Sequence, residues 1–164
     1  MFNVSEITGD ALKSDAQVIC HQVNCLGVMG AGIALQIRYQ FPTVFKKYKC
    51  FCNRHESEEL LGQAQFCKIG EEKYICNLFG QMNCDANKRQ TDYNALNSAV
   101  IEMLEKLKSN NFIPKKIAIP KYIGCGLAGG DWTIVKEIFT SRIEEFCKEN
   151  NFSITLEIVE FSND

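Results

Sequence analysis

The sequence lacks the features that mark a membrane-spanning, exported, repetitive or disordered chain. No apolar run approaches the roughly 18 residues of a membrane-spanning segment, and the first ten residues, MFNVSEITGD, carry no secretion signal. No repeat or low-complexity tract is present, and only three prolines occur in 164 residues. The 46% of hydrophobic residues is ordinary for a protein with a packed core. We therefore expect one domain over residues 1–164, located in the cytoplasm, with no membrane partner.

A large excess of charge of one sign is also missing. The chain has 18 Lys and Arg residues against 20 Asp and Glu residues, which gives a net charge of -2. This balance argues against a protein that binds nucleic acid through bulk positive charge, and it leaves open only a local basic face. The sequence does not predict an oligomeric state.

Cysteine is the residue type that is over-represented, with nine in the chain. An odd number excludes complete internal pairing, and a reducing cytoplasm favours free thiols that act as small hydrophobes, metal ligands or nucleophiles. The one tight cluster is Cys50-x-Cys52-x2-His55, to which Cys84 could add a fourth zinc ligand. Because no second paired cluster exists, neither a metal site nor a cofactor is predicted.

Hydrophobic patterns along the chain alternate between those of strands and those of helices. Strands are predicted at residues 2–7, 16–23, 62–69, 73–79, 115–119 and 152–161. Helices are predicted after Gly32, from Pro42, after Thr91 or Asp92, and after Asp131. The short turn around Gly70 indicates that two of the strands pair in antiparallel fashion. This order predicts an α/β fold with helices on both faces of a mixed sheet.

Two glycine-rich loops lie where a strand gives way to a helix. The first is VNCLGVMGAG at residues 23–32, and the second is IGCGLAGGDW at residues 123–132. Ligands in α/β sheets bind beyond the carboxyl ends of strands, and glycines there let backbone amides approach an anion. Two such loops facing each other suit a diphosphate, although either alone could simply be a tight turn. Neither loop has the Walker or the Rossmann glycine pattern.

The residues of these loops resemble those of a macrodomain. The segments HQVNCLGVMGAGIALQI and IPKYIGCGLAGGDW are similar to the branch that contains ADP-ribose-1''-phosphate phosphatases and terminal ADP-ribose-protein glycohydrolases. The resemblance extends from the GDAL segment near the start to the last strand. It implies a three-layer α/β/α fold with a six-stranded mixed sheet, and a cleft for ADP-ribose across the strand ends.

The resemblance also implies which residues bind ADP-ribose. Asp10 matches the acid that reads the adenine amino group, and Asn24 matches an asparagine at the distal ribose. The other implied contacts are Gly30, Ala31 and Gly32 around the distal ribose and its phosphate, Ile123, Gly124, Cys125, Gly126 and Leu127 under the diphosphate, and Phe161 against the adenine. The structural alternative for Asp10 is the cap of a helix or turn. The structural alternative for Asn24 is a residue that simply begins a turn.

The catalytic residues of one branch are not present at the matching positions. Glycohydrolases that use a lysine and an aspartate would place them where this chain has Gln81 and Ala128. The nearest acid is Asp131, whose position also suits the cap of a helix. A mechanism through a lysine adduct is therefore not expected.

His21 is the remaining candidate for acid/base catalysis, because the phosphatase-like branch also has a histidine before its Asn-Cys pair. It would act beside Asn24, and its structural alternative is a core histidine. Asp92 is a weaker candidate that also suits a helix cap. Cys25 and Cys125 lie in the two loops, where a nucleophilic role would need a base and a lowered pKa.

The sequence thus predicts an ADP-ribose-binding protein that hydrolyses a bond at the distal ribose. The reaction would remove a 1''-phosphate, or would release ADP-ribose from a modified macromolecule. The alternative is a non-catalytic reader of ADP-ribosylated targets, which the missing Lys/Asp pair favours. A third alternative is a nucleotide-binding α/β domain unrelated to ADP-ribose.

Overall fold

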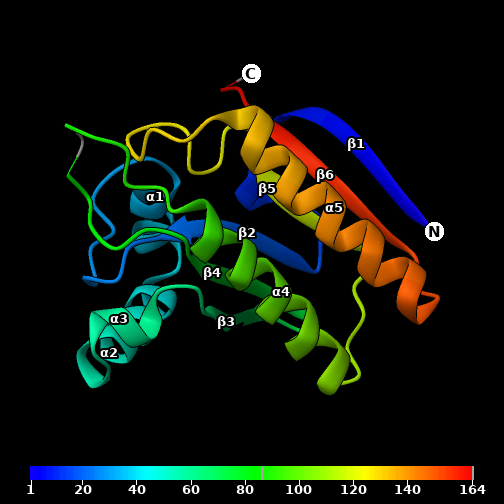
Figure 1. Ribbon diagram of the computed structural model, residues 1–164, viewed down its shortest axis with the longest axis horizontal. Coiled ribbons are helices and arrows are strands. Elements are labelled where there is room, and N and C mark those ends of the chain that lie inside the picture. The colour runs from blue at the N-terminus through cyan, green and yellow to red at the C-terminus, as the bar shows by residue number, and fades with distance from the viewer. Residues whose placement is uncertain (86, 164) are drawn as a thin grey trace.

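The computed structural model describes residues 1–85 and 87–163, and it contains one six-stranded sheet (Figure 1). The strands are β1 (Phe2–Gly9), β2 (Val18–Val23), β3 (Ala64–Gly70), β4 (Lys73–Phe79), β5 (Lys116–Pro120) and β6 (Ile154–Phe161). Their order in the sheet is β1-β6-β5-β2-β4-β3. All neighbouring pairs are parallel except β3 and β4, which are antiparallel. The predicted mixed sheet is therefore confirmed.

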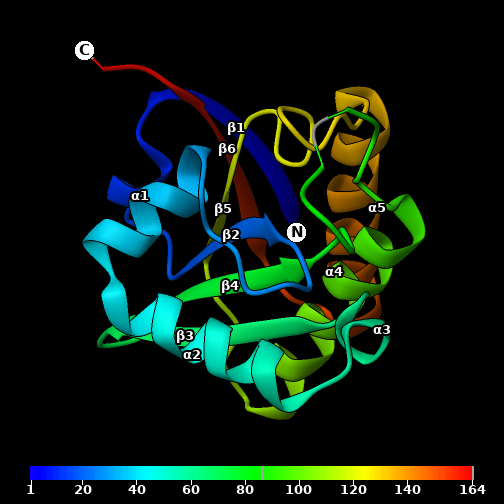
Figure 2. The same cartoon turned by 90° about the vertical axis from the view of Figure 1, so that its left-hand side faces the viewer.

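Helices cover both faces of this sheet and make the predicted three layers. The helical elements are the 3-10 helix η1 (Ala11–Lys13), α1 (Gly32–Gln40), α2 (Pro42–Arg54), α3 (Ser57–Leu60), α4 (Tyr93–Ser109) and α5 (Trp132–Asn150). Helices α1 and α2 lie on one side of the sheet, and α4 and α5 lie on the other (Figure 2). Among the described residues, no helix combines the length and the apolar character needed to cross a membrane.

The core consists of two apolar clusters, one on each face of the sheet. On one face, the α4 stripe of Leu96, Val100 and Met103 packs against the sheet with no exposed surface. On the opposite face, Ile37 of α1 and Tyr48 of α2 are equally buried. Strand β2 supplies apolar side chains to both clusters, which explains its nearly continuous hydrophobic sequence.

The sequence-based element bounds differ from the observed ones by up to two residues at the element ends. The exceptions are η1 and α3, which were not predicted because three or four residues are too short for a helical hydrophobic period. Asp92, rather than Thr91, caps α4 by accepting a hydrogen bond from the Ala95 amide at 3.0 Å. Asp131 caps α5 in the same way through the Thr133 amide at 2.8 Å. Asp92 and Asp131 are therefore helix caps, which was the structural alternative to a catalytic role for each of them.

Candidate functional site

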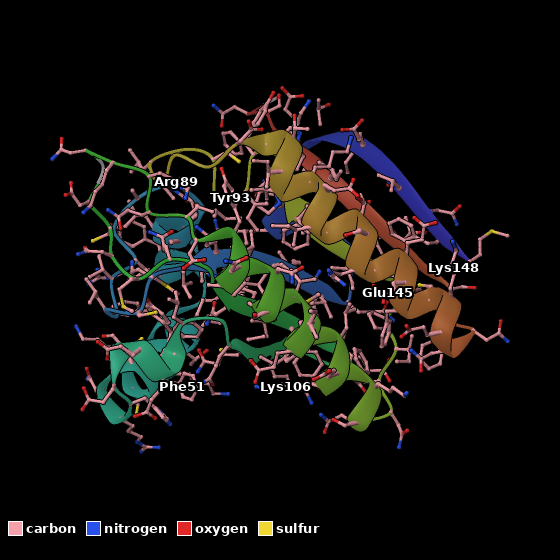
Figure 3. All side chains as sticks on the ribbon, viewed as in Figure 1. Phe51, Arg89, Tyr93, Lys106, Glu145 and Lys148 are labelled. Atoms are coloured by element: carbon pink, nitrogen blue, oxygen red, sulfur yellow. The ribbon has the colours of Figure 1, made fainter. Side chains whose placement is uncertain are left out.

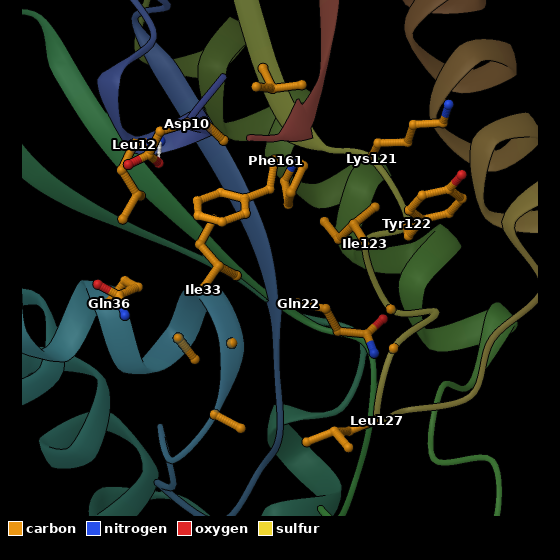
Figure 4. A pocket seen from close by; sticks show the side chains of 18 of the residues that line it. Asp10, Leu12, Gln22, Ile33, Gln36, Lys121, Tyr122, Ile123, Leu127 and Phe161 are labelled. Carbon is orange, nitrogen blue, oxygen red and sulfur yellow. Dashed lines mark hydrogen bonds between the residues drawn. The ribbon is translucent and has the colours of Figure 1, made fainter. Parts of the chain in front are cut away.

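A long cleft lies beyond the carboxyl ends of the central strands (Figure 4). Its volume is about 1000 Å³. Four segments form its walls: the turn and η1 after β1, the start of α1, the loop between β5 and α5, and the end of β6. The two glycine-rich loops therefore face the same space, as the parallel strand ends require.

A smaller pocket of about 280 Å³ continues the cleft at one end. The two pockets share Gln22, Ala31, Ala34, Gln81, Leu127 and Ala128. The smaller one adds Asn24, Val28 and Gly30 from the first glycine-rich loop, and Cys84 and Gln90 from the loop after β4. The site is thus a long groove with a narrow extension.

Asp10 lies at the opposite end of the cleft, where it begins η1. One carboxylate oxygen, Oδ1, accepts a hydrogen bond from the Leu12 amide at 2.9 Å. The other oxygen makes no hydrogen bond within the described part of the chain and remains able to accept one. Phe161 also lines this end, with 69% of its surface exposed. A carboxylate acceptor beside an exposed aromatic ring suits a flat heterocycle with an amino group.

The amino terminus of α1 presents unpaired backbone amides to the cleft. Its N-cap, Ala31, provides no side-chain acceptor, whereas Asp92 and Asp131 cap α4 and α5. The amides of Gly32, Ile33 and Ala34 have no hydrogen-bond partner among the described residues, and all three residues line the cleft. The free amides and the positive end of the helix dipole together make an anion-binding site.

The loop between β5 and α5 presents a second set of free amides. No residue that the structure describes accepts a hydrogen bond from the amides of Gly126, Leu127 or Ala128, which line the cleft opposite α1. The loop is held by the Gly130 amide, which donates to the Gly124 carbonyl at 2.9 Å. The hydroxyl of Thr91 donates to the same carbonyl at 2.6 Å. The two glycine-rich loops thus offer facing amides to a ligand with two adjacent anionic groups.

A network of side-chain amides lies where the two pockets meet. Gln22 Nε2 donates to Gln81 Oε1 at 2.9 Å and to Thr91 Oγ1 at 2.8 Å. Gln81 Nε2 in turn donates to the Asn83 carbonyl at 2.6 Å. A Cβ atom at position 80 would overlap the Gln22 amide, and a Cβ at position 124 would lie 2.9 Å from its Oε1 atom. Gly80 and Gly124 therefore leave the space that the Gln22 side chain occupies.

Asn24 lines the smaller pocket, and most of the hydrogen-bonding capacity of its side chain is taken up within the first glycine-rich loop. Oδ1 accepts hydrogen bonds from the amides of Leu26 and Val28 at 3.0 and 3.2 Å and from the Tyr48 hydroxyl at 2.8 Å. Nδ2 donates to the Val28 carbonyl at 2.8 Å. One Nδ2 hydrogen is left for a ligand, so Asn24 organises the loop and offers a single donor.

The position of His21 does not fit the acid/base role predicted for it. His21 lies on β2, is completely buried and lines neither pocket. Its Nε2 atom contacts Asn77 Oδ1 at 2.5 Å, whereas Nδ1 has no partner among the described residues. Burial lowers the pKa of His21 to about 4, so the ring is neutral near pH 7. The adjacent residue Gln22 faces the cleft instead, because successive side chains of a strand point to opposite faces.

The remaining catalytic candidates also lie away from the cleft. Neither Asp92 nor Asp131 lines a pocket. Cys125 does not line one either, and its thiol donates to the Ile123 carbonyl at 3.3 Å. Burial raises the pKa of Cys125 to about 11 and that of Cys25 to about 12. Both thiols are therefore protonated near pH 7 and are poor nucleophiles.

No metal cluster forms from the cysteines and histidines of the described chain. No group of three or more His, Cys, Asp or Glu residues there could hold a metal ion. Cys50 and Cys84 are exposed, whereas Cys52 is buried in the core. Cys52 packs below the first glycine-rich loop, so it could not bind a zinc ion at the surface together with Cys50 and Cys84.

Several residues that line the cleft were not among the predicted site residues. Lys13, Gln22, Gln36 and Lys121 also line it, and the Lys121 ammonium forms an ion pair with Glu160 at 3.4 Å. Tyr122 also lines the rim, has a φ of 68°, and packs edge-on against Trp132 with 5.7 Å between ring centroids. The signal that could have found Lys121 and Tyr122 is their place directly before the second glycine-rich loop.

The loop after β4 is tied to the second glycine-rich loop and closes the smaller pocket. The amides of Gln90 and Thr91 both donate to the Ala128 carbonyl, at 2.8 and 3.1 Å. The Arg89 guanidinium lies 4.6 Å above the Tyr93 ring at this edge of the molecule (Figure 3). The Tyr93 hydroxyl accepts a hydrogen bond from the Asp131 amide at 2.9 Å, which connects the starts of α4 and α5.

Known proteins are similar to this chain in sequence and in fold. A family model described as Macro domain matches residues 20–139. A DNA ADP-ribosyl glycohydrolase of Mycobacterium tuberculosis is 28% identical over 141 residues, covering 84% of this chain and 38% of that protein. An ADP-ribose 1''-phosphate phosphatase of Saccharomyces cerevisiae is 35% identical over 83 residues, covering 48% of this chain and 46% of that protein. The chain thus spans well under two thirds of either relative.

Solved structures extend the similarity to the whole fold. Thermosipho africanus DarTG in complex with ADP-ribose superimposes with a TM-score of 0.75 at 24% identity, covering 96% of this chain and 41% of that one. At this level of identity, the likeness concerns the fold alone.

Proposed function

Because the chain belongs to the macrodomain family, we propose that it binds ADP-ribose in the long cleft and acts at the distal ribose. The observation that carries this proposal is the pair of facing loops whose residues line a cleft of about 1000 Å³ and whose amides have no partner within the described part of the chain. A diphosphate needs donors on both sides and gains from a helix amino terminus. We also propose that residues 1–164 form a single macrodomain, of which residues 86 and 164 lie outside the described range.

The orientation of the ligand follows from the two ends of the cleft. The adenine would lie between Asp10 and Phe161, with the second Asp10 oxygen accepting from the exocyclic amine. The diphosphate would lie between the amides of Gly32 and Gly126. The distal ribose would then reach Gln22 and Gln81, and its substituent would enter the smaller pocket beside Gly30.

Hydrolysis at the distal ribose is the first candidate activity. The relatives include a DNA ADP-ribosyl glycohydrolase and an ADP-ribose 1''-phosphate phosphatase. In this chain the polar side chains nearest to that position are Gln22 and Gln81, whose amides already hydrogen-bond to each other, to Thr91 and to Asn83, so the phosphates of the ligand would help to orient a water molecule. His21 has no part in this proposal, because it is buried outside the cleft.

A non-catalytic reader is the second candidate, and the chemistry of the smaller pocket favours it. Among the described residues that line this pocket, only Cys84 carries an ionisable side chain. A hydrolase normally gains a factor of about 10²–10⁴ from a positioned general acid or base. Gln81 cannot supply this factor, because its amide does not titrate and is already hydrogen-bonded on both sides.

Turnover separates the two candidates. We expect the protein to release ADP-ribose from ADP-ribosyl protein or ADP-ribosyl DNA, or phosphate from ADP-ribose 1''-phosphate, each followed by chromatography. His21→Gln should leave the rate unchanged, because the ring does not reach the cleft. Saturable ADP-ribose binding without release from any of the three substrates would make the protein a reader.

A further inference from the structure

One segment of this slightly acidic chain contains no acidic residue. Residues 16–55 contain five of the 18 Lys and Arg residues and none of the 20 Asp and Glu residues. This segment forms β2, the first glycine-rich loop, α1 and α2. The segment by itself therefore carries five positive charges, in a chain whose overall net charge is -2.

One cation of α1 and one of α2 lie over the same aromatic ring. The guanidinium of Arg38 lies 4.4 Å from the centroid of the Phe45 ring, and the ammonium of Lys49 lies 5.7 Å from it. Lys46, one turn before Lys49, is exposed as well. We call Arg38, Lys46 and Lys49 the basic face. None of the three forms a salt bridge with any acid in the described part of the chain.

The basic face adjoins the narrow end of the ADP-ribose cleft. The Lys49 side chain packs on the first glycine-rich loop, where a Cβ atom at Gly27 would lie 3.7 Å from Lys49 Cγ. The next residues of that loop, Val28 and Gly30, line the smaller pocket. Figure 2 shows this loop running from the end of β2 into α1, on the side of the sheet that carries α2. A polymer attached at the distal ribose would leave the cleft beside these cations.

Exposed apolar side chains accompany these cations on the first glycine-rich loop and on α1. Leu26 and Val28 are 48% and 44% exposed, and Tyr39, which follows Arg38, is 71% exposed. Surfaces that hold a single nucleic-acid strand combine cations for the phosphates with apolar or aromatic side chains for the bases. An acidic peptide would need the cations but would not use the exposed aromatic ring.

We propose that the basic face binds the phosphodiester backbone of a nucleic-acid strand that carries the ADP-ribose. The binding of a strand to Arg38, Lys46 and Lys49 stands on the charge pattern and the fold alone. The further step, that the strand is the ADP-ribosylated substrate, rests on the proposed function. The strand would cross α1 and α2 while its modified nucleotide lies at the smaller pocket.

Charge reversal tests this surface. A fluorescein-labelled single-stranded DNA oligonucleotide is titrated with the protein at several salt concentrations, and binding is followed by anisotropy. We expect Arg38→Glu/Lys49→Glu to weaken binding by at least about tenfold and to lower the salt slope by about 0.7 for each phosphate that the variant no longer neutralises. The matched control is Lys108→Glu/Lys115→Glu, which makes the same charge change at exposed sites near the amino-terminal ends of the strands.

The outcomes distinguish this inference from the proposed function. Calorimetry with free ADP-ribose should give the same affinity for wild type and Arg38→Glu/Lys49→Glu, which also shows that the variant folds. The variant Arg38→Gln/Lys49→Gln removes the same two positive charges without adding negative ones, and it should also bind the oligonucleotide more weakly. If the wild type binds ADP-ribose but not the oligonucleotide, the inference fails and the proposed function stands. Equal weakening in the two charge-reversed variants, or equally tight binding of poly-glutamate, would also overturn it.

Discussion

At the scale of single residues, two neighbours on β2 have opposite environments. His21 is completely buried with an unpartnered Nδ1, whereas Gln22 reaches into the cleft and links Gln81 to Thr91. The sequence could place both residues on one strand but could not decide which of them faces the ligand. A strand buried on both faces has no polar alternation from which its register can be read.

The buried His21 makes the stability of the protein dependent on pH. Its folded-state pKa of about 4 lies below the ordinary value of 6.5, so the unfolded chain binds the extra proton more readily. Stability is therefore complete above pH 6.5 and is lost as the pH falls toward 4. At about 1.36 kcal/mol per pKa unit, the loss approaches roughly 3 kcal/mol. Urea unfolding between pH 4 and 7.5 measures it.

His21→Gln is the control for this pH dependence, because a glutamine retains a donor for Asn77 but does not titrate. Its free energy of unfolding should change less with pH between 6.5 and 4 than that of the wild type. A variant with the same pH dependence as the wild type would show that another group causes the effect.

At the scale of elements, the loop between β5 and α5 separates a structural glycine from a ligand-facing one. A Cβ atom at Gly130 would lie 2.6 Å from the Gly124 carbonyl oxygen, whereas a Cβ at Gly126 meets no atom within 4 Å. The two positions therefore allow the same substitution to test stability and binding separately.

We expect Gly126→Ala to leave the melting temperature nearly unchanged and to weaken ADP-ribose binding by about tenfold, which corresponds to 1.4 kcal/mol. The added methyl group would stand where the diphosphate approaches the backbone. Gly130→Ala should instead destabilise the fold by about 1–3 kcal/mol through overpacking. Thermal denaturation and calorimetry measure both effects, and a decrease in stability without a decrease in affinity in Gly126→Ala would contradict the assignment.

The helices and strands were largely predictable from the sequence, whereas the loop side chains that line the cleft were not. The stripe through Leu96, Val100 and Met103 predicts α4 because helical spacing places the three on one face. Asp10 and the glycines, which were predicted through the resemblance to a macrodomain, line the two pockets. Lys121 and Tyr122 were missed, because which loop side chain points into a cleft depends on backbone turns such as the positive φ of Tyr122.

At the scale of the whole molecule, the two pockets and the first glycine-rich loop follow one another along one side. The long cleft opens into the smaller pocket through Gln22 and Gln81, and the first glycine-rich loop leads from that pocket to Lys49. Net charge alone argued against nucleic-acid binding, because it averages this side with the acidic remainder of the chain. The fold, by contrast, brings the cations of α1 and α2 together beside the cleft.

Calorimetric titration with ADP-ribose tests the central claim most directly. We predict saturable binding at one site per chain in the wild type. Asp10→Asn should bind about tenfold more weakly, because its single acceptor oxygen is already used by the Leu12 amide. No heat of binding at millimolar ADP-ribose would contradict the account, as would tighter binding of ATP or NAD than of ADP-ribose.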